Sequence, residues 1–427
     1  MLRPDKEFYI FVYLPGAVEA VPAAIVRLDD EGRLSGSYGR LYSQRREAVP
    51  VDPVSMPLAF PSFALEPGRM GAVRDAAPDL WGRLVIARAL GRNAEELHER
   101  DYLLFSNAAR TGNLDFRASL KDGEPESEPP LSSDADILLD AAENLERERP
   151  VAPQYMELLA QGSSMGGSRP KSAMLHDGIL WIAKFPAKGD KWSNARVEKS
   201  SMELAADCGI DVPELRLLDV EGRDVLLVRR FDREPVPGGF ARRGYLSALS
   251  LCRWTELERA AYSYEAIADS AAAMGVKNLS QLFRRMAFNV LCRNTDDHPR
   301  NHGFLANGHS LVLAPAFDIV PSAFDIVPSA STYGVGMHVT HAMNIGNAGR
   351  LGSVANVLSC APRFGLTRVQ AEDVLAGMLA TIAQWRESFE RNGVREDETE
   401  RFRWSFEHWE SDPEAQALLD RRGPALR

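Results

Sequence analysis

The chain has 427 residues, of which 45% are hydrophobic and 26% are charged, and its formal net charge is −10. This length and composition are typical of a soluble globular protein with two or three cores, and they argue against a membrane protein or a disordered chain. The acidic balance argues against broad binding to nucleic acid driven by counterion release.

Location can also be predicted from composition. No apolar run approaches the roughly 18–20 residues that a bilayer-spanning helix needs, and the opening segment MLRPDKEFYIFVYLPG lacks the basic-then-apolar order of a signal peptide. The four cysteines are widely spaced and form no CxxC pair, which argues against a zinc ribbon or a disulfide framework. We therefore expect a cytoplasmic protein with no membrane partner.

The first part of the chain, residues 1–120, reads as a strand-rich amino-terminal subdomain. The runs FYIFVYLPG and VPAAIVRLDDEGRLSGSYG predict a hairpin, with breaks at Pro15-Gly16 and at the DEG turn. The segment PDLWGR (78–83) leads into a predicted helix, LVIARALGR, that ends at Gly91. We expect Trp81 in this segment to be packed.

Residues 121–155 are predicted to form a linker and one helix. The charged, proline-containing stretch 121–133 has no periodicity and predicts a solvated loop. The sequence DADILLDAAENLERE that follows it predicts an amphipathic helix.

Residues 156–240 predict a small β-rich lobe. A glycine-rich loop (162–172, GSSMGGSRPKS) precedes a strand (179–186, ILWIAKFP), a helix (196–209) that stops at Gly209, and a further strand (225–231, VLLVRRF). Residues 241–427 predict a mostly helical lobe, so the expected fold class is α+β and bilobal.

Two helices of the second lobe stand out. In LFRRMAFNVLCRN, the apolar residues Phe283, Met286, Ala287, Val290 and Leu291 have helical spacing and predict a buried helix that leads directly into the loop TDDHPRN. The segment 366–393 starts with a capping box at Thr367 and Gln370 and predicts one long helix.

The loop TDDHPRN and the segment AFD that follows it carry the strongest chemical signal. Asp296, Asn301 and Asp318 have the residue types that a phosphoryl-transfer site needs, to orient a hydroxyl group and to hold magnesium. Asp-rich turns are also frequent in ordinary loops, so this pattern alone is equally compatible with a helix end.

Two histidines in the same loop suggest a different site. His298 and His302 are four residues apart, but Pro299 and Gly303 disfavour the continuous helix that a shared zinc site would use. We expect His298 to hold the loop by hydrogen bonds instead.

The glycine-rich loop and the strand after it suggest a phosphate site. Its glycines and Lys171 suit anionic oxygens, although the GxxxxGK[ST] order of a P-loop is absent and a surface linker is the alternative. Lys184 shares a strand face with apolar residues and needs a partner, for which Glu198 is the first choice and Glu203 the second. A lysine that reaches solvent at the strand end is the alternative.

These motifs follow one another in the order of a protein-kinase-like fold, and the chain resembles the HipA-type serine/threonine kinases, the toxins of bacterial toxin–antitoxin pairs. The resemblance spans nearly the whole chain and rests on LPG, PDLWGR, GSSMGGSRPKS, WIAKFP, LLVRRFDR, NTDDHPRNHGFL and LAPAFDIVPS. It implies ATP and Mg²⁺ as cofactors.

The resemblance also assigns roles to single residues. It makes Asp296 the catalytic aspartate, Lys184 the lysine that reaches the ATP phosphates, and Asn301 and Asp318 the Mg²⁺ ligands. Ser164 would be an autophosphorylated serine in the phosphate loop, whose modification switches the kinase off. The remaining nucleotide-binding positions are Gly166, Gly167, Lys171, Glu198, Arg229 and Phe231. At Arg229, some relatives carry an acidic residue.

The resemblance further implies partners. These are a helix-turn-helix antitoxin of HipB type, through which DNA is contacted indirectly, and a protein substrate such as an aminoacyl-tRNA synthetase.

Besides Arg229, the chain departs from the family in a second and more serious way, because residues 316–322 (AFDIVPS) recur as residues 323–329. Asp318 keeps the expected spacing from Asn301, whereas Asp325 keeps the spacing to the downstream STYGVGMHV. Two other functions therefore stay open: a catalytically impaired HipA-like module that acts with an antitoxin in a repressor complex, and a small-molecule phosphotransferase.

Overall fold

The computed structural model describes residues 7–105, 109–123, 129–161, 167–308, 310–323 and 339–421. The chain folds as two compact units. Unit one comprises residues 1–190, 214–255 and 304–310, and unit two comprises residues 191–213, 256–303 and 311–427. Within the described ranges, no helix is long and apolar enough to cross a membrane.

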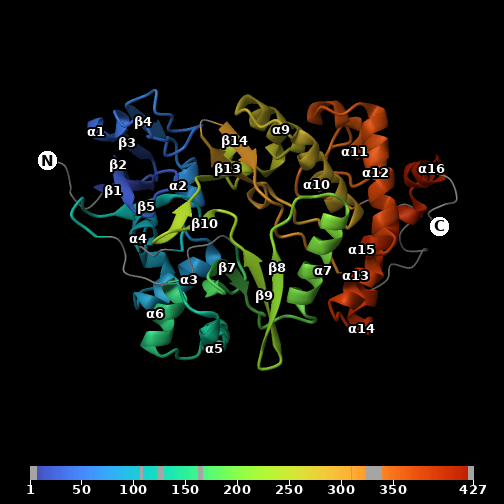
Figure 1. The fold of residues 1–427 in the computed structure, drawn as a ribbon, viewed down its shortest axis with the longest axis horizontal. Helices are drawn as coiled ribbons and strands as arrows, with labels where there is room; N and C mark the ends of the chain where they lie inside the picture. Colours follow the sequence, from blue (N-terminus) through green and yellow to red (C-terminus); the bar gives the residue numbers. More distant parts are fainter. Residues whose placement is uncertain are drawn as a thin grey trace. The chain divides into compact units, whose positions relative to one another are not determined.

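The amino-terminal part of unit one is an antiparallel sheet with the strand order β4-β3-β2-β1-β5 (Figure 1). The predicted hairpin is confirmed, because β1 (Glu7–Tyr13) pairs with β2 (Ala20–Leu28). The other strands and the two short helices of this part are β3 (Leu34–Tyr38), α1 (Arg40–Ser43), β4 (Ser62–Leu65), α2 (Ala72–Asp75) and β5 (Leu114–Arg117).

Helix α3 (Leu80–Ala89) follows the PDLWGR motif as predicted. The chain turns away at Gly91, whose φ of +63° lies in the left-handed region that favours glycine. Trp81 in the first turn of α3 is 3% exposed, as expected. Helix α4 (Glu99–Leu104) comes next.

The second sheet of unit one has the order β6-β7-β9-β8, and all its strand pairs are antiparallel. Its strands are β6 (Lys171–His176), β7 (Ile179–Lys184), β8 (Leu215–Val220) and β9 (Arg223–Arg229). One face packs against helices α3, α5 (Ala135–Glu146) and α6 (Pro153–Gln161) in a core that includes Trp81, Leu138, Leu159 and Trp181 (Figure 1). These three helices therefore cover this face of the sheet.

Three features of this region differ from the prediction. Strand β6 includes Lys171 and Ser172, which were expected in the glycine-rich loop, and α6 was not predicted. The expected loop 121–133 is attached to the sheet at its end, because Leu131 pairs with Leu175 of β6 and Leu175 N–H donates to Pro130 O at 2.7 Å. Such pairing depends on a distant strand, so local composition cannot reveal it.

A hairpin and a third sheet complete the strands. The hairpin consists of β10 (Arg233–Val236) and β11 (Gly239–Arg242), and the third sheet has the order β12-β13-β14. Its strands are β12 (Tyr245–Ser247), β13 (Gly303–Asn307) and β14 (Ser310–Leu313), and the short helix α8 (Ala248–Leu251) follows β12.

Unit two is mostly helical. Its first helix, α7 (Asn194–Asp207), begins with Ser193, whose side chain accepts a hydrogen bond from Arg196 N–H, and the chain leaves it at Gly209, whose φ is +76°. The others are α9 (Tyr264–Ala273), α10 (Leu279–Leu291), α11 (Val354–Ser359), α12 (Arg368–Ile382), α13 (Trp385–Arg391), α14 (Glu396–Thr399), α15 (Arg403–Glu407) and α16 (Pro413–Arg421). The predicted apolar face of α10 is confirmed, since all five of its predicted residues are at most 2% exposed.

The prediction of one long helix over 366–393 is wrong. The capping box of Thr367 and Gln370 is present, but α12 ends at Ile382 and α13 starts at Trp385. Gln384 N–H bonds to Thr381 O at 3.0 Å, which tightens the last turn. The break places Trp385 against Phe406, with stacked rings whose centroids are 4.8 Å apart. Packing of this aromatic pair is a tertiary interaction that helical periodicity does not contain.

Candidate active site

The two neighbouring aspartates of the loop TDDHPRN have different environments. Asp296 is exposed, whereas Asp297 is 3% exposed. The hydroxyl group of Tyr264 donates to the Asp297 carboxylate, and Nε2 of His302 lies 3.1 Å from Asp297 Oδ2. Asp297 therefore anchors the loop to the helical unit, while the carboxylate of Asp296 is presented at the surface.

The anchoring histidine differs from the prediction. His302 is 2% exposed, and its ring packs edge-on against Tyr264 at a centroid distance of 5.3 Å. Nδ1 of His298, by contrast, has no hydrogen-bond partner within the described residues. His302 rather than His298 holds the loop, because its position at the start of β13 places it beside the buried Tyr264.

Asn301 occupies a short turn in the same loop. The 3₁₀ turn Pro299–Asn301 begins with proline, whose fixed φ suits the first position of such a turn, and Asn301 N–H donates to His298 O at 2.9 Å. Asn301 is 9% exposed. The turn thus holds a largely buried amide side chain five residues after Asp296.

The first AFDIVPS copy is bonded at both ends to unit two. Ala316 N–H donates to Asp211 O at 2.7 Å, and Ser322 N–H donates to Arg293 O at 3.1 Å. The hydroxyl groups of Ser322 and Thr295 lie 2.7 Å apart. Since Thr295 directly precedes Asp296, these bonds connect the segment that carries Asp318 to the loop that carries Asp296.

Asp318 itself has an uncommon backbone conformation. Its φ is +60°, a left-handed value that Asp adopts more readily than most residues and that occurs often at functional sites. Its side chain is half-buried. Asp325, the alternative metal ligand of the second copy, lies outside the described residues.

The oxygen-rich donor set suits magnesium better than zinc. Asn301 and Asp318 offer an amide and a carboxylate, and Mg²⁺ takes such oxygens together with water and phosphate oxygens. Among the residues whose positions are described, no group of three or more His, Cys, Asp or Glu side chains is arranged to hold a metal ion.

In unit one, two lysines lie side by side on the second sheet. Lys171 of β6 and Lys184 of β7 are directly opposite in the antiparallel register, so their side chains share a face. Ala173 and Ile182 form the next pair on this face, which is opposite to the face covered by α5 and α6. This face of the sheet therefore carries two neighbouring lysine side chains.

Lys171 also reaches back over the end of the glycine-rich loop. Lys171 is 7% exposed, and a Cβ atom built on Gly167 would lie 2.0 Å from its Nζ atom. Gly167 has a φ of +115°, which L side chains rarely adopt. An alanine at this position would keep a strained backbone and would require the Lys171 side chain to move. The other predicted loop residues, Ser164 and Gly166, lie outside the described residues.

The remaining predicted nucleotide-binding residues have mixed environments. Glu198 is 7% exposed on α7, and its pairing with Lys184 stays a prediction. Arg229 ends β9, and its backbone N–H donates to Glu214 O at 2.9 Å inside the sheet. The backbone N–H group of Arg229 is therefore already bonded within unit one.

A buried charge cluster directly after Phe231 was not predicted. Asp232 is 4% exposed and accepts hydrogen bonds from Arg230, from Arg233 and from Gly112 N–H at 2.8–2.9 Å. Burial alone would raise the pKa of Asp232, but the two guanidinium groups hold it well below its usual range. Arg230 and Arg233 also donate to the backbone carbonyl of Arg110. The cluster thus fixes the chain after β9 to the segment around Arg110. Its only sequence signal is the charge pattern RRFDR.

Comparison with known proteins identifies the family. Residues 163–386 match the model of the HipA-like C-terminal domain, which is more than half of the chain. The chain belongs to this family. The resemblance to HipA proteins that the motifs suggested is therefore confirmed.

Two solved structures are similar to this chain in fold. One, described as the Shewanella oneidensis MR-1 toxin–antitoxin system HipA, HipB and its operator DNA complex, matches 97% of this chain and 97% of its own, with a TM-score of 0.67 and 15% identity. Another, the Helicobacter pylori proinflammatory kinase CtkA, matches 59% of this chain and 95% of its own, with a TM-score of 0.41 and 15% identity. A comparison with curated proteins gives no match. The HipA match over nearly the whole length confirms the predicted α+β, bilobal fold class.

Proposed function

We propose that this HipA-like protein is an ATP- and Mg²⁺-dependent serine/threonine kinase. The observation that carries the proposal is the pairing of Lys171 and Lys184 on one sheet face, with the Lys171 ammonium group beside Gly167. Phosphate oxygens would neutralise both charges, and the backbone N–H groups of a glycine-rich loop suit the same oxygens. Lys184 would then reach the ATP phosphates and pair with Glu198.

Unit two would supply the remaining chemistry. Asp296, as the exposed carboxylate of an anchored loop, would orient the acceptor hydroxyl group and accept its proton. Asn301 and Asp318 would hold Mg²⁺, which neutralises charge on the phosphates when bound. The backbone of Arg229 and Phe231 would contact adenine.

We infer the biological role of this protein from its membership of the HipA-like family. The Shewanella HipA structure contains HipB and operator DNA, and we infer a HipB-type antitoxin as partner, with DNA contacted through that partner. By the same reasoning the protein would be a cytoplasmic toxin, would phosphorylate a protein of the aminoacyl-tRNA synthetase class, and would autophosphorylate Ser164.

Incubation with labelled ATP and Mg²⁺ followed by mass mapping tests the kinase activity. We expect phosphate on the wild type, with Ser164 as the site, and at least a hundredfold less on Asp296→Asn, in line with the roughly 10²–10⁴-fold contribution of a general base. Asp177→Asn is the matched control, because Asp177 is an exposed aspartate whose side chain is 67% exposed and pairs only with surface groups. Equal labelling of wild type and Asp296→Asn would exclude the proposed role.

One observation favours a second function, a catalytically impaired module that acts with its antitoxin in a repressor complex. The AFDIVPS repeat adds seven residues directly after the segment of Asp318. Deletion of residues 323–329 distinguishes the two functions. A gain of kinase activity in the deletion variant would show that the repeat disables the site, whereas an active wild type with unchanged activity after deletion would show that the repeat is accommodated.

A further inference from the structure

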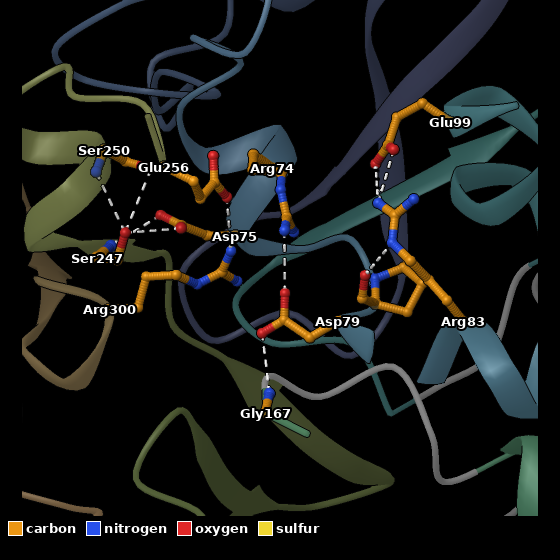
Figure 2. A network of polar contacts seen from close by, with 11 residues as sticks. Arg74, Asp75, Asp79, Arg83, Glu99, Gly167, Ser247, Ser250, Glu256 and Arg300 are labelled. Carbon is orange, nitrogen blue, oxygen red and sulfur yellow. Dashed lines mark hydrogen bonds and ion pairs between the residues drawn. The ribbon is translucent and has the colours of Figure 1, made fainter. Parts of the chain in front are cut away.

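The start of helix α3 is bonded to the end of the glycine-rich loop. Asp79 is the N-cap residue of α3. An N-cap aspartate usually accepts a hydrogen bond from a backbone N–H of its own helix, but the side chain of Asp79 makes no such capping bond. Its Oδ2 atom instead accepts from Gly167 N–H at 2.9 Å, and its Oδ1 atom accepts from Arg74 Nη2 at 3.1 Å. Figure 2 shows Asp79 between these two partners.

Trp81 adds two bonds to the same segment. Its backbone N–H, one of the groups that a first helical turn leaves without an intrahelical acceptor, donates to Gly167 O at 3.4 Å. Its indole Nε1–H donates to Lys171 O at 3.1 Å. Trp81 is itself packed in the core between α3 and the second sheet. Residues 79–81 therefore hold both polar groups of Gly167 and the first residue of β6.

These bonds fix the part of the loop that faces the proposed phosphate site. Gly167 has a positive φ that glycine permits, and a Cβ atom built on it would lie 2.0 Å from Lys171 Nζ. Glycine loses more conformational freedom on ordering than any other residue. A loop that is held before the ligand arrives avoids much of that cost at the moment of binding.

We propose that Asp79 and Trp81 are positioning residues for the phosphate loop, and that the amino-terminal subdomain thereby sets the affinity for ATP. This inference rests on the proposed kinase function. Neither residue would contact the nucleotide, because both act through Gly167 and Lys171. The central contact of this arrangement is the bond from Gly167 N–H to Asp79, whose carboxylate is also bonded to Arg74.

Two variants of the α3 N-cap residue Asp79 and one control variant in α4 distinguish positioning of the loop from general stability. Asp79→Ala removes the acceptor, and Asp79→Asn keeps a carbonyl oxygen for Gly167 N–H while it loses the charge that faces Arg74. Glu99→Gln is the matched control. Glu99 of α4 bonds Arg83 of α3 at 2.6 Å through a half-buried ion pair that involves neither Gly167 nor Lys171 (Figure 2).

Two readouts are measured on the full chain: the split between KM for ATP and kcat in the labelling assay, and hydrogen exchange at the Gly167 amide without nucleotide. For Asp79→Ala we expect KM to rise roughly 5- to 30-fold, the factor that corresponds to a loss of one or two kcal/mol of loop order, with little change in kcat. Exchange at Gly167 should accelerate by a similar factor. Asp79→Asn should lie closer to the wild type, and Glu99→Gln should match the wild type in both readouts.

Equal effects of Asp79→Ala and Glu99→Gln on KM would overturn the proposal. An unchanged rate of hydrogen exchange at Gly167 in Asp79→Ala would also overturn the proposal, and this readout needs no nucleotide. Failure of the wild type to bind ATP would refute the proposed kinase function instead. If Asp79→Ala does not fold, Trp81→Phe, which keeps an aromatic ring in the core and removes the bond to Lys171 O, gives the same test.

Discussion

Replacement of Asp232 by Asn removes the carboxylate that Arg230 and Arg233 share after β9. Asp232 accepts from Arg230, Arg233 and Gly112 N–H, and Arg230 and Arg233 are at most 6% exposed. The variant leaves these two guanidinium groups buried without the negative charge that now faces them. Because Asn has nearly the same shape, packing changes little and the effect reports the charge.

The expected loss follows from burial. Removal of one partner of a buried ion pair typically costs about 3–5 kcal/mol, because the other charge stays buried without compensation. For a unit of this size, this loss lowers the melting temperature by roughly 6–20 °C. Differential scanning calorimetry of the wild type and Asp232→Asn measures it. The control Asp177→Asn breaks the surface pair of Asp177 and Arg216 and should leave the transition in place.

The buried interaction of Asp232 with Arg230 and Arg233 also predicts that stability depends on pH in the acid range. The pKa of Asp232 is held well below its usual range in the folded state, so the unfolded chain takes up the proton first as the pH falls. The stability that Asp232 contributes is therefore complete above about pH 5 and declines below about pH 4, near the pKa of an unperturbed aspartate. Asp232→Asn should show a shallower decline over this range. A loss below about 1 kcal/mol at pH 7, or an identical acid profile for both proteins, would refute this reasoning.

Three further predictions concern the loop, the anchor and a buried histidine. Gly167→Ala should weaken ATP binding at least tenfold, because a Cβ atom there would meet Lys171 Nζ and the φ of +115° disfavours alanine. Titration calorimetry measures this affinity. The control is Gly178→Ala in the exposed β6–β7 turn, where φ is also positive but no atom lies close to a built Cβ. Tyr264→Phe removes the hydroxyl bond to Asp297 and should lower kcat roughly tenfold with an unchanged KM for ATP, since a misplaced catalytic loop affects the reaction step; an unchanged kcat would show that Asp297 needs no such anchor. Burial lowers the pKa of His341 although Asp297 opposes this, so the native state keeps a neutral ring while the unfolded chain is protonated below about pH 6.5. Stability in urea should consequently fall between about pH 7.5 and 5.5, and His341→Gln should flatten that slope; parallel slopes would contradict the assignment.

The local pattern of the sequence determined much of the fold and of the candidate site. The spacing of Phe283, Met286 and Val290 predicted α10, because one face of a helix must be apolar to be buried. The alternation in ILWIAKFP placed Lys184 on a strand face, and the structure has that strand. These predictions succeeded because periodicity and capping act over a few neighbouring residues.

Tertiary structure decided how those residues are used. The sequence pointed to Asp296 for the chemistry and gave Asp297 no role, and the buried contacts with Tyr264 and His302 made Asp297 the anchor. The pairing of Lys171 with Lys184 and the bond from Gly167 to Asp79 depend on strand register and on a helix far away along the chain. Sequence spacing cannot supply such contacts, since they form only when distant segments are packed together.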